Sequence, residues 1–265
     1  MPRLVSAAID LDIDESADLV FSVAVSRSVP VEDERLTFTQ DGRRLVAGEL
    51  VDSSGSRLHR LSAEQGLLEV RYTATVVGRE PAAPADDLEA LTCLRPSRYC
   101  ESDVLFGRAR QQFSGMESFD LLSAIADFAA TNLAYAPDAS QGTDSAVTTL
   151  ETGRGVCRDY AHVVIALLRA MDVPARYASC YAPGLVPMDF HAVAEAYLDG
   201  DWHAVDATRL ANRHTLVRIA TGRDAADCAF LSQHGGSVTL RRLQVDAEST
   251  DAAPADDHVT SARMA

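Results

Sequence analysis

The chain contains one segment, Gly153-Arg154-Gly155-Val156-Cys157-Arg158-Asp159-Tyr160-Ala161-His162, in which a glycine-rich turn leads to a cysteine. The apolar run 163–171 follows, and its length and composition predict a helix that begins at Cys157. Free N–H groups and the positive end of the dipole at a helix start favour a thiolate over a thiol. Cys157 is therefore the first candidate for a reactive residue, and the other candidates are those that could serve it.

The composition indicates a globular protein with enough length for one large domain or two smaller ones. The 265 residues are 47% hydrophobic and 24% charged. The net charge is −15, which argues against a nucleic-acid partner and against an anionic membrane surface, because the chain has no basic stripe. We expect the acidic surface to serve solubility.

The cysteines and the N-terminus suggest the compartment. The chain has five cysteines, an odd number, widely spaced and without a CxxC pair, which predicts neither a disulfide framework nor a structural zinc site. The residues Met1-Pro2-Arg3-Leu4 do not begin a secretory signal, and no apolar run approaches the length of a membrane span. We expect a reduced, cytoplasmic protein.

The first part of the chain predicts an all-β domain, a sandwich or barrel, over residues 1–80. Three strand-like runs separated by turn residues carry this prediction: 19–25, 35–39 and 67–77. Residues 81–87 form a linker by composition, with two prolines, small residues and charge. The pattern then changes, and residues 88–245 are expected to be a second domain. Residues 246–265 are expected to be a disordered tail.

The second domain predicts an α+β fold, in which helices precede an antiparallel sheet. The expected helices are 88–93, 103–113, 118–133, 145–150 and the Cys157 helix to about 171. The expected strands are 175–181, 191–198, 202–206, 215–220 and 237–245.

A nucleophilic cysteine needs a base and a group that orients the base. His191 begins one expected strand, and Asp206 ends the strand that follows the Asp199-Gly200 turn. The outer ends of a hairpin lie side by side, so this register permits an imidazole–carboxylate hydrogen bond. The sequence thus predicts a catalytic triad of Cys157, His191 and Asp206.

Other polar residues in these motifs have simpler interpretations. His162 lies five residues after Cys157, off its face of the helix, and is expected to be structural. Asp159 is expected to pair with Arg158 or Arg154, and His203 alternates to the opposite face of the hairpin. The other four cysteines are expected in the core. Zinc held by the three triad residues is the rival chemical interpretation, but a helix start stabilises a thiolate without a cation.

Several motifs follow one another in the second domain: Gly155-Val156-Cys157-Arg158-Asp159-Tyr160-Ala161, Val173-Pro174-Ala175-Arg176-Tyr177, Asp189-Phe190-His191-Ala192-Val193-Ala194-Glu195, Trp202-His203-Ala204-Val205-Asp206-Ala207-Thr208 and Gly222-Arg223-Asp224-Ala225-Ala226-Asp227. In this order they resemble the motifs of the bacterial transglutaminase-like superfamily, to which transglutaminase-like cysteine proteases of papain-like fold belong. The match covers roughly residues 90–235, and the preceding β region resembles the N-terminal domain of many such proteins.

The resemblance implies papain-like acyl transfer on a peptide or glutaminyl amide. Cys157 would be the nucleophile, His191 the base and Asp206 the residue that orients His191. The thioester would pass to water, as in a protease or amidase, or to an amine, as in a transglutaminase; hydrolysis is favoured. A non-enzymatic binding module on the same fold is the remaining alternative. The expected partner is a peptide or protein substrate, and the sequence does not indicate the oligomeric state.

One feature departs from the animal transglutaminases, which use a tryptophan upstream of the cysteine in the oxyanion site. The single tryptophan here, Trp202, lies downstream. The backbone N–H of Cys157 is the expected first oxyanion donor, and the second is open, with Tyr160 and the segment 132–135 as candidates. No acidic run has calcium-loop spacing, so we expect neither a metal nor another cofactor.

Overall fold

The first strand, β1 (Arg3–Glu15), shows why the first part of the chain forms a sheet. The computed structural model describes residues 2–79 and 86–264. Alternate side chains of β1 are buried from Val5 to Ile13, which is the period of a strand with one face on a core. The sequence analysis did not identify this strand, although the alternation is present in the sequence.

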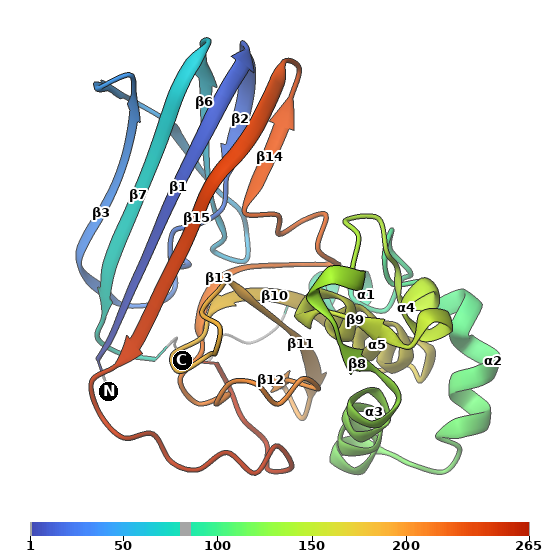
Figure 1. The fold of residues 1–265 in the computed structure, drawn as a ribbon. Coiled ribbons are helices and arrows are strands. Elements are labelled where there is room, and N and C mark those ends of the chain that lie inside the picture. Colours follow the sequence, from blue (N-terminus) through green and yellow to red (C-terminus); the bar gives the residue numbers. More distant parts are fainter. Residues whose placement is uncertain (1, 80–85, 265) are drawn as a thin grey trace.

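Two antiparallel sheets pack together as a sandwich, as predicted in kind. One has the strand order β15-β1-β7-β3-β4, and the other has the order β14-β2-β6-β5. Figure 1 shows the two sheets standing above the rest of the molecule. The strands other than β1 are β2 (Ala17–Phe21), β3 (Val31–Gln40), β4 (Arg43–Leu45), β5 (Gly48–Val51), β6 (Arg57–Ala63), β7 (Gly66–Val76), β14 (Leu231–His234) and β15 (Ser237–Ser249).

The expected domain boundary at residue 245 is wrong, because the sandwich takes strands from both ends of the chain. β15 pairs with β1 over almost its whole length, and β14 pairs with β2. The sequence analysis placed 237–245 in the second domain. Periodicity identifies a strand but not its partner, so the pairing of β1 with a strand more than 200 residues away was not predictable from the local pattern.

Residues 246–265 were expected to be a disordered tail, but much of this segment contacts the folded chain. Its first residues belong to β15, and the segment after β15 passes beneath the core sheet (Figure 1). There Asp256 accepts hydrogen bonds from the buried Arg213, and Ala204 N–H donates to the carbonyl of Ala262. Of the expected linker 81–87, residues 81–85 lie outside the described part, and Asp86 caps the first helix.

The remaining chain forms an α+β core, which confirms the predicted fold class. Its antiparallel sheet has the order β12-β11-β10-β13. The strands are β10 (Ala175–Tyr181), β11 (His191–Leu198), β12 (Asp201–Val205) and β13 (Val217–Gly222), and the parallel pair β8 (Ala134–Tyr135) and β9 (Arg154–Gly155) lies apart. The helices are α1 (Asp87–Thr92), α2 (Ser102–Gln112), α3 (Ser118–Asn132), a 3₁₀ turn (Pro137–Ala139), α4 (Ala146–Thr152) and α5 (Cys157–Ala170).

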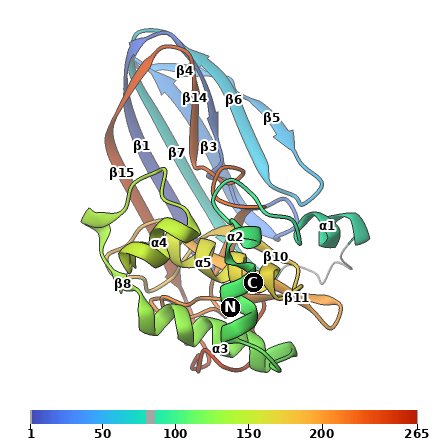
Figure 2. The same ribbon diagram turned by 90° about the vertical axis from the view of Figure 1, so that its right-hand side faces the viewer.

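Helix α5 is the centre of the core. Every residue from Asp159 to Ala170 is buried, so the helix is covered on all sides, by the sheet and by α2, α3 and α4. In Figure 2 the sandwich stands above this core, and α3 lies at the end of the core farthest from the sandwich. Only the N-terminal end of α5 retains partly exposed residues, Cys157 and Arg158.

The sandwich and the core share one hydrophobic interior. The hydroxyl of Tyr181 in β10 donates to the carbonyl of Val23 at 2.7 Å, and its ring stacks on Tyr72 of β7. Ser26 N–H donates to the carbonyl of Arg218 in β13. The sandwich is therefore fixed against the core sheet by buried contacts. Within residues 2–79 and 86–264, no helix is long and apolar enough to cross a membrane.

Candidate active site

Cys157 is the first residue of α5, as the sequence predicted, and two glycines hold it there. Gly153 ends α4 with a left-handed backbone, φ +67°, which glycine adopts without strain. A Cβ on Gly155 would lie 2.6 Å from the Cβ of Asp159, so a larger residue would displace that carboxylate. The Asp159 carboxylate accepts the Val156 N–H at 2.9 Å and thereby caps the helix.

Asp159 and Arg158 form the ion pair that the sequence analysis expected. Their closest atoms are 2.7 Å apart, and Asp159 is fully buried. Ser140 donates a further hydrogen bond to the same carboxylate. The first turn of α5 is therefore rigid, and Cys157 is held at its edge with a partly exposed side chain.

The structure brings His191 and Asp206 together at the end of the β11–β12 hairpin. The regular pairing ends at Ala194 and Val205, and the two side chains lie just beyond it. His191 Nε2 and Asp206 Oδ2 are 2.9 Å apart, and both side chains are almost inaccessible to solvent. The hairpin thus has the register that the sequence analysis proposed.

The Asp206 carboxylate is held in its ionised form. Burial opposes its charge, but His191 and the hydrogen bonds from Thr208 outweigh this and lower the pKa of Asp206. Both the Thr208 hydroxyl and the Thr208 N–H donate to Oδ1, at 2.6 and 3.0 Å. Oδ2 is left facing His191, so the carboxylate is oriented as well as charged.

His191 is correspondingly held in its protonated form. Burial disfavours the imidazolium, but the charge and hydrogen bond of Asp206, together with the nearby Cys157, raise the pKa of His191 to about 10. Its other ring nitrogen, Nδ1, bonds to no nitrogen or oxygen of the described residues. Cys157 and His191 line the same cavity. Nδ1 is therefore available to donate a hydrogen bond to the sulfur of Cys157.

Tyr135, at the end of β8, adds a group that the sequence analysis named only as part of the segment 132–135. β8 pairs with β9, which places Tyr135 opposite Gly155, two residues before Cys157. The Tyr135 hydroxyl lies close enough to the backbone and side chain of Cys157 to interact with both. Burial and the charge of Cys157 raise the pKa of Tyr135 to about 12, so the hydroxyl keeps its proton.

The other candidate for the second oxyanion donor, Tyr160, lies elsewhere. Its buried hydroxyl donates to the carbonyl of Leu133 at 2.7 Å. His162 is fully buried between the rings of Tyr99 and Tyr177, and burial lowers its pKa to about 3. It therefore remains neutral and structural, as expected from its position on the helix.

The remaining titratable residues of the motifs also lie outside the site. His203 bonds to the carbonyl of Leu198 and to Ser261, away from Cys157. The four other cysteines are buried and free, as expected. In the part of the chain that the structure describes, no three His, Cys, Asp or Glu side chains gather in a way that could hold a metal ion.

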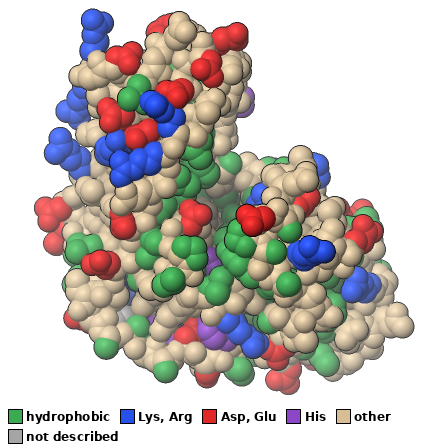
Figure 3. Space-filling model, viewed as in Figure 1, with side chains coloured by type: hydrophobic (Ala, Val, Ile, Leu, Met, Phe, Trp, Pro, Cys, Tyr) green, Lys and Arg blue, Asp and Glu red, His purple; other side chains and the backbone are tan. Residues whose placement is uncertain are grey.

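Cys157 and His191 open into a cavity of about 480 Å³ between the core and the sandwich. Figure 3 shows hydrophobic side chains gathered in the hollow where the two parts meet. Most of the lining comes from the core: Tyr99, Gly142, Val156, Arg158, Tyr177, Ser179, Asp189, Phe190, Ala192, Ile219, Ala225, Ala226, Cys228 and Ala229. Ser22, Phe230 and Leu243 come from the sandwich and its connection to the core.

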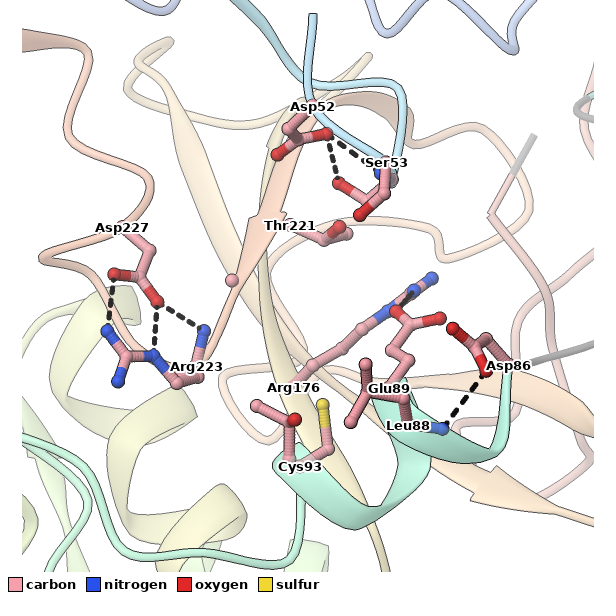
Figure 4. A pocket seen from close by; sticks show the side chains of 13 residues that line it. Asp52, Ser53, Asp86, Leu88, Glu89, Cys93, Arg176, Thr221, Arg223 and Asp227 are labelled. Atoms are coloured by element: carbon pink, nitrogen blue, oxygen red, sulfur yellow. Dashed lines mark hydrogen bonds and ion pairs between the residues drawn. The ribbon is translucent and has the colours of Figure 1, made fainter.

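A second cavity, of about 430 Å³, lies between α1, the loop after β5 and the end of β13. Figure 4 shows that its charged side chains bond to one another: Arg223 pairs with Asp227, and Arg176 with Glu89. Asp86 caps α1. These contacts satisfy its main charged groups internally, so this cavity has a structural explanation.

The sequence analysis missed the contribution of the sandwich to the cavity. Leu243 and Ser22 carry no motif, and only the pairing of β15 with β1 brings Leu243 to the site. Asp189 and Phe190 were quoted in the histidine motif but were given no role; both line the cavity. Their place directly before His191 was the available signal.

Comparison with known proteins identifies the class of protein to which the chain belongs. The chain belongs to the transglutaminase-like superfamily, whose family model matches residues 108–207. The crystal structure of a “putative cysteine protease” from Cytophaga hutchinsonii is 34% identical, with a TM-score of 0.86, over 96% of this chain and 92% of that one. The similarity to that protein therefore includes the sandwich as well as the core.

Two other proteins share a weaker similarity with this chain. An uncharacterized protein of Mycobacterium leprae is 30% identical over 116 residues, which are 41% of this chain and 42% of that protein. This chain thus matches less than half the length of that relative. The periplasmic domain of TgpA from Pseudomonas aeruginosa is 18% identical, with a TM-score of 0.42, over 77% of this chain and 90% of that one.

Proposed function

We propose that this protein is a cysteine-dependent acyl-transfer enzyme that hydrolyses peptide or glutaminyl amide bonds. The observation that carries the proposal is the buried His191–Asp206 pair, which opens into the same cavity as Cys157 at the start of α5. Nucleophilic catalysis by a thiol needs these three groups in this relation. The family, and the Cytophaga hutchinsonii protein that the chain resembles over nearly its whole length, support the same reaction class.

In the proposed first step, the Cys157 thiolate attacks the amide carbonyl and forms a carbon–sulfur bond. His191, protonated through neutral pH, gives its Nδ1 proton to the leaving amine as the carbon–nitrogen bond breaks. Asp206 holds the ring by Nε2 and stabilises its positive charge. In the second step His191 takes a proton from water, the resulting hydroxide attacks the thioester carbonyl, and the carbon–sulfur bond breaks. The carboxylic acid leaves, and Cys157 returns to the thiolate beside the imidazolium of His191.

The oxyanion of both tetrahedral intermediates would lie at the start of α5. The Cys157 N–H, at the helix start, is the first proposed donor, and the Tyr135 hydroxyl lies near Cys157. We propose Tyr135 as the second donor: its partly exposed side chain turns its O–H to the substrate oxygen. Donors aimed at the developing charge contribute several kcal/mol to such reactions, about 2.7–4 kcal/mol for one donor.

The experiment that tests this function is a screen of peptide amides and glutaminyl peptides, with and without added primary amines, on the wild type and on Cys157→Ala. Turnover that disappears in Cys157→Ala supports the enzyme. Ammonia or amine release without incorporation of the added amine supports hydrolysis; incorporation would identify a transglutaminase. No turnover at all would favour a binding module, and stoichiometric zinc lost on Cys157→Ala would favour a metal site.

The compartment belongs to the same proposal. All five cysteines are free, and four of them are buried. This state suits the reducing cytoplasm, which we propose as the location. A peptide or protein is the proposed partner, and the acidic chain, with a net charge of −15, is not expected to bind nucleic acid or an anionic membrane.

A further inference from the structure

The cavity beside Cys157 is completed by residues from outside the α+β core. Ser22 follows β2, Leu243 lies in β15, and Phe230 is in the connection that leads from the core to β14. The Ser22 N–H donates to the carbonyl of Phe230 at 3.0 Å, which ties that connection to the sandwich. One wall of the active-site cavity is therefore built by the sandwich and its connection.

This wall and the facing core surface are apolar. The ring of Phe230 stacks on that of Phe190, with centroids 5.6 Å apart and planes 29° apart. Phe190 is the residue directly before His191, so the stacked pair lies next to the base. Ile219 of β13 and Leu243 of β15 add aliphatic surface to the same cavity. A cavity of about 480 Å³ has room for a large side chain and adjoining backbone.

Outside the triad, the described lining carries two charged side chains, Arg158 and Asp189. Arg158 is bonded to Asp159 and to Ser140. Asp189 accepts the Phe190 N–H at 2.7 Å and is exposed at the edge of the cavity. An acidic substrate side chain would find no unpaired cation among the described lining residues, and a basic one would meet the Asp189 carboxylate only at the exposed edge. Either charge would lose its hydration on moving further in. The Ser22 hydroxyl, buried and without a partner in residues 2–79 and 86–264, remains for a neutral polar group such as a peptide N–H or carbonyl.

We infer that this cavity binds a large apolar side chain, aromatic or branched aliphatic, within two residues of the carbonyl that Cys157 attacks, on its acyl side, and that the sandwich supplies the wall that selects it. The inference rests on the proposed function, because it names the substrate class of that same site. The sandwich is thereby part of the substrate-binding site.

The test uses covalent probes that do not require the natural substrate to be known. Two series of N-acetyl dipeptidyl chloromethyl ketones place glycine at one position and phenylalanine, leucine, glutamate or lysine at the other. In one of the two series, phenylalanine and leucine should alkylate Cys157 at least about tenfold faster than glutamate and lysine, the discrimination that an apolar pocket provides. Equal rates, or a faster rate with a charged residue in both series, would overturn the inference.

Variants of the wall assign the preference to the sandwich. Phe230→Ala and Leu243→Ala should each reduce the ratio of the phenylalanine rate to the glutamate and lysine rates to about threefold or less. Leu240→Ala is the matched control: Leu240 lies in the same strand, is 46% exposed and does not line the cavity. Its preference should equal that of the wild type. Leu243→Trp fills the cavity instead of enlarging it. It should slow alkylation by the phenylalanine probe and leave unchanged the rate with a further probe, N-acetyl-glycyl-glycyl chloromethyl ketone.

Iodoacetamide separates this inference from the proposed function. The reagent needs no pocket, so it should alkylate Cys157 at the wild-type rate in every folded wall variant. If wild-type Cys157 reacts with iodoacetamide like a free thiol, the proposed function fails. If it reacts fast while the dipeptidyl probes show no preference, only the inference about the pocket fails. A preference that survives in both Phe230→Ala and Leu243→Ala would also contradict it.

Discussion

Strand β11 carries two buried ionic sites, and they differ in what surrounds them. At its middle, Glu195 is fully buried and bonds to Arg176 and to both terminal nitrogens of Arg218, at 2.6–2.8 Å. At its start, His191 bonds to Asp206. In both sites a buried carboxylate has a partner, but arginine does not release its proton and histidine does.

The Glu195 site is closed. Burial opposes the charge of Glu195, but the two guanidinium groups lower its pKa to about 2. Arg176 is further fixed by Glu89 and by the ring of Trp202, 4.1 Å from its guanidinium carbon. Every part of the cluster is engaged, so its role is to hold β10, β11 and β13 in place.

The His191 site is open. One ring nitrogen is bound to Asp206 and the other is unpaired among the described residues and adjoins the cavity of Cys157. The two charge clusters on this strand therefore differ in their chemistry. Only the His191 site has a proton that can be transferred, and its free nitrogen faces the cavity into which the proton would go. The comparison predicts that the first site controls stability and the second controls turnover.

The largest expected effect is that of Asp206→Asn. The ring of His191 would lose the charge that stabilises its imidazolium and the acceptor that fixes its tautomer, so we expect kcat to fall by about 10⁴-fold. The measurement is the turnover of the best amide from the substrate screen, with circular dichroism to show that the fold is retained. Turnover within tenfold of the wild type would remove Asp206 from the mechanism.

The next effect is on stability. Glu195→Gln removes the buried carboxylate that Arg176 and Arg218 share, while Arg176 keeps its pair with Glu89, and the free energy of unfolding should fall by about 3–5 kcal/mol. Urea unfolding measures it. The control is Asp227→Asn, which breaks the partly exposed pair with Arg223 and should cost less than about 1 kcal/mol. If both variants unfold at the same urea concentration, the Glu195 cluster does not hold β10, β11 and β13 in place.

Tyr135→Phe should have a smaller effect on turnover than Asp206→Asn. The Cys157 N–H remains as a donor and only the second is removed, so kcat should fall by about 100-fold with KM little changed. Tyr160→Phe provides the matched control, because its hydroxyl bonds to the carbonyl of Leu133, away from the sulfur. A change in KM alone would assign Tyr135 to substrate binding.

The smallest expected effects are those of pH, and they differ between the two sites: pH limits turnover through His191 and stability through Glu195. His191 has a raised pKa, so its charged pair is fully formed below pH about 6.5, and turnover should decline as the pH rises through about 10. Glu195 has a lowered pKa, so its stabilising effect is present above pH about 4.5 and is lost as the pH falls toward 2. Rate profiles and acid unfolding curves measure these limits. A shared limit would show that one site governs both properties.

The sequence predicted the core better than the sandwich for a physical reason. Strands 175–181 and 191–198 and the start of α5 follow from local pattern, and the hairpin register follows from one turn. These features place His191, Asp206 and Cys157. β1 has an equally clear alternation, yet its partner β15 lies at the other end of the chain, and no local pattern contains that pairing.

The contacts around Cys157 were predictable only in part. That an oxyanion donor should exist followed from the chemistry, but the choice of Tyr135 over Tyr160 depends on the short β8–β9 pair, two residues in each strand. Leu243 reaches the cavity only through the pairing of β15. Such positions depend on tertiary packing, which the spacing of residues in the sequence does not describe.

The central claim is that Cys157 reacts as a thiolate paired with the imidazolium of His191. Its most direct test is the rate of iodoacetamide alkylation of Cys157, identified by mass spectrometry, at pH 7 in the wild type and in His191→Ala. We predict a rate at least about tenfold above that of a free thiol in the wild type, which falls to that of a free thiol in His191→Ala. A wild-type rate no faster than that of a free thiol would contradict the claim.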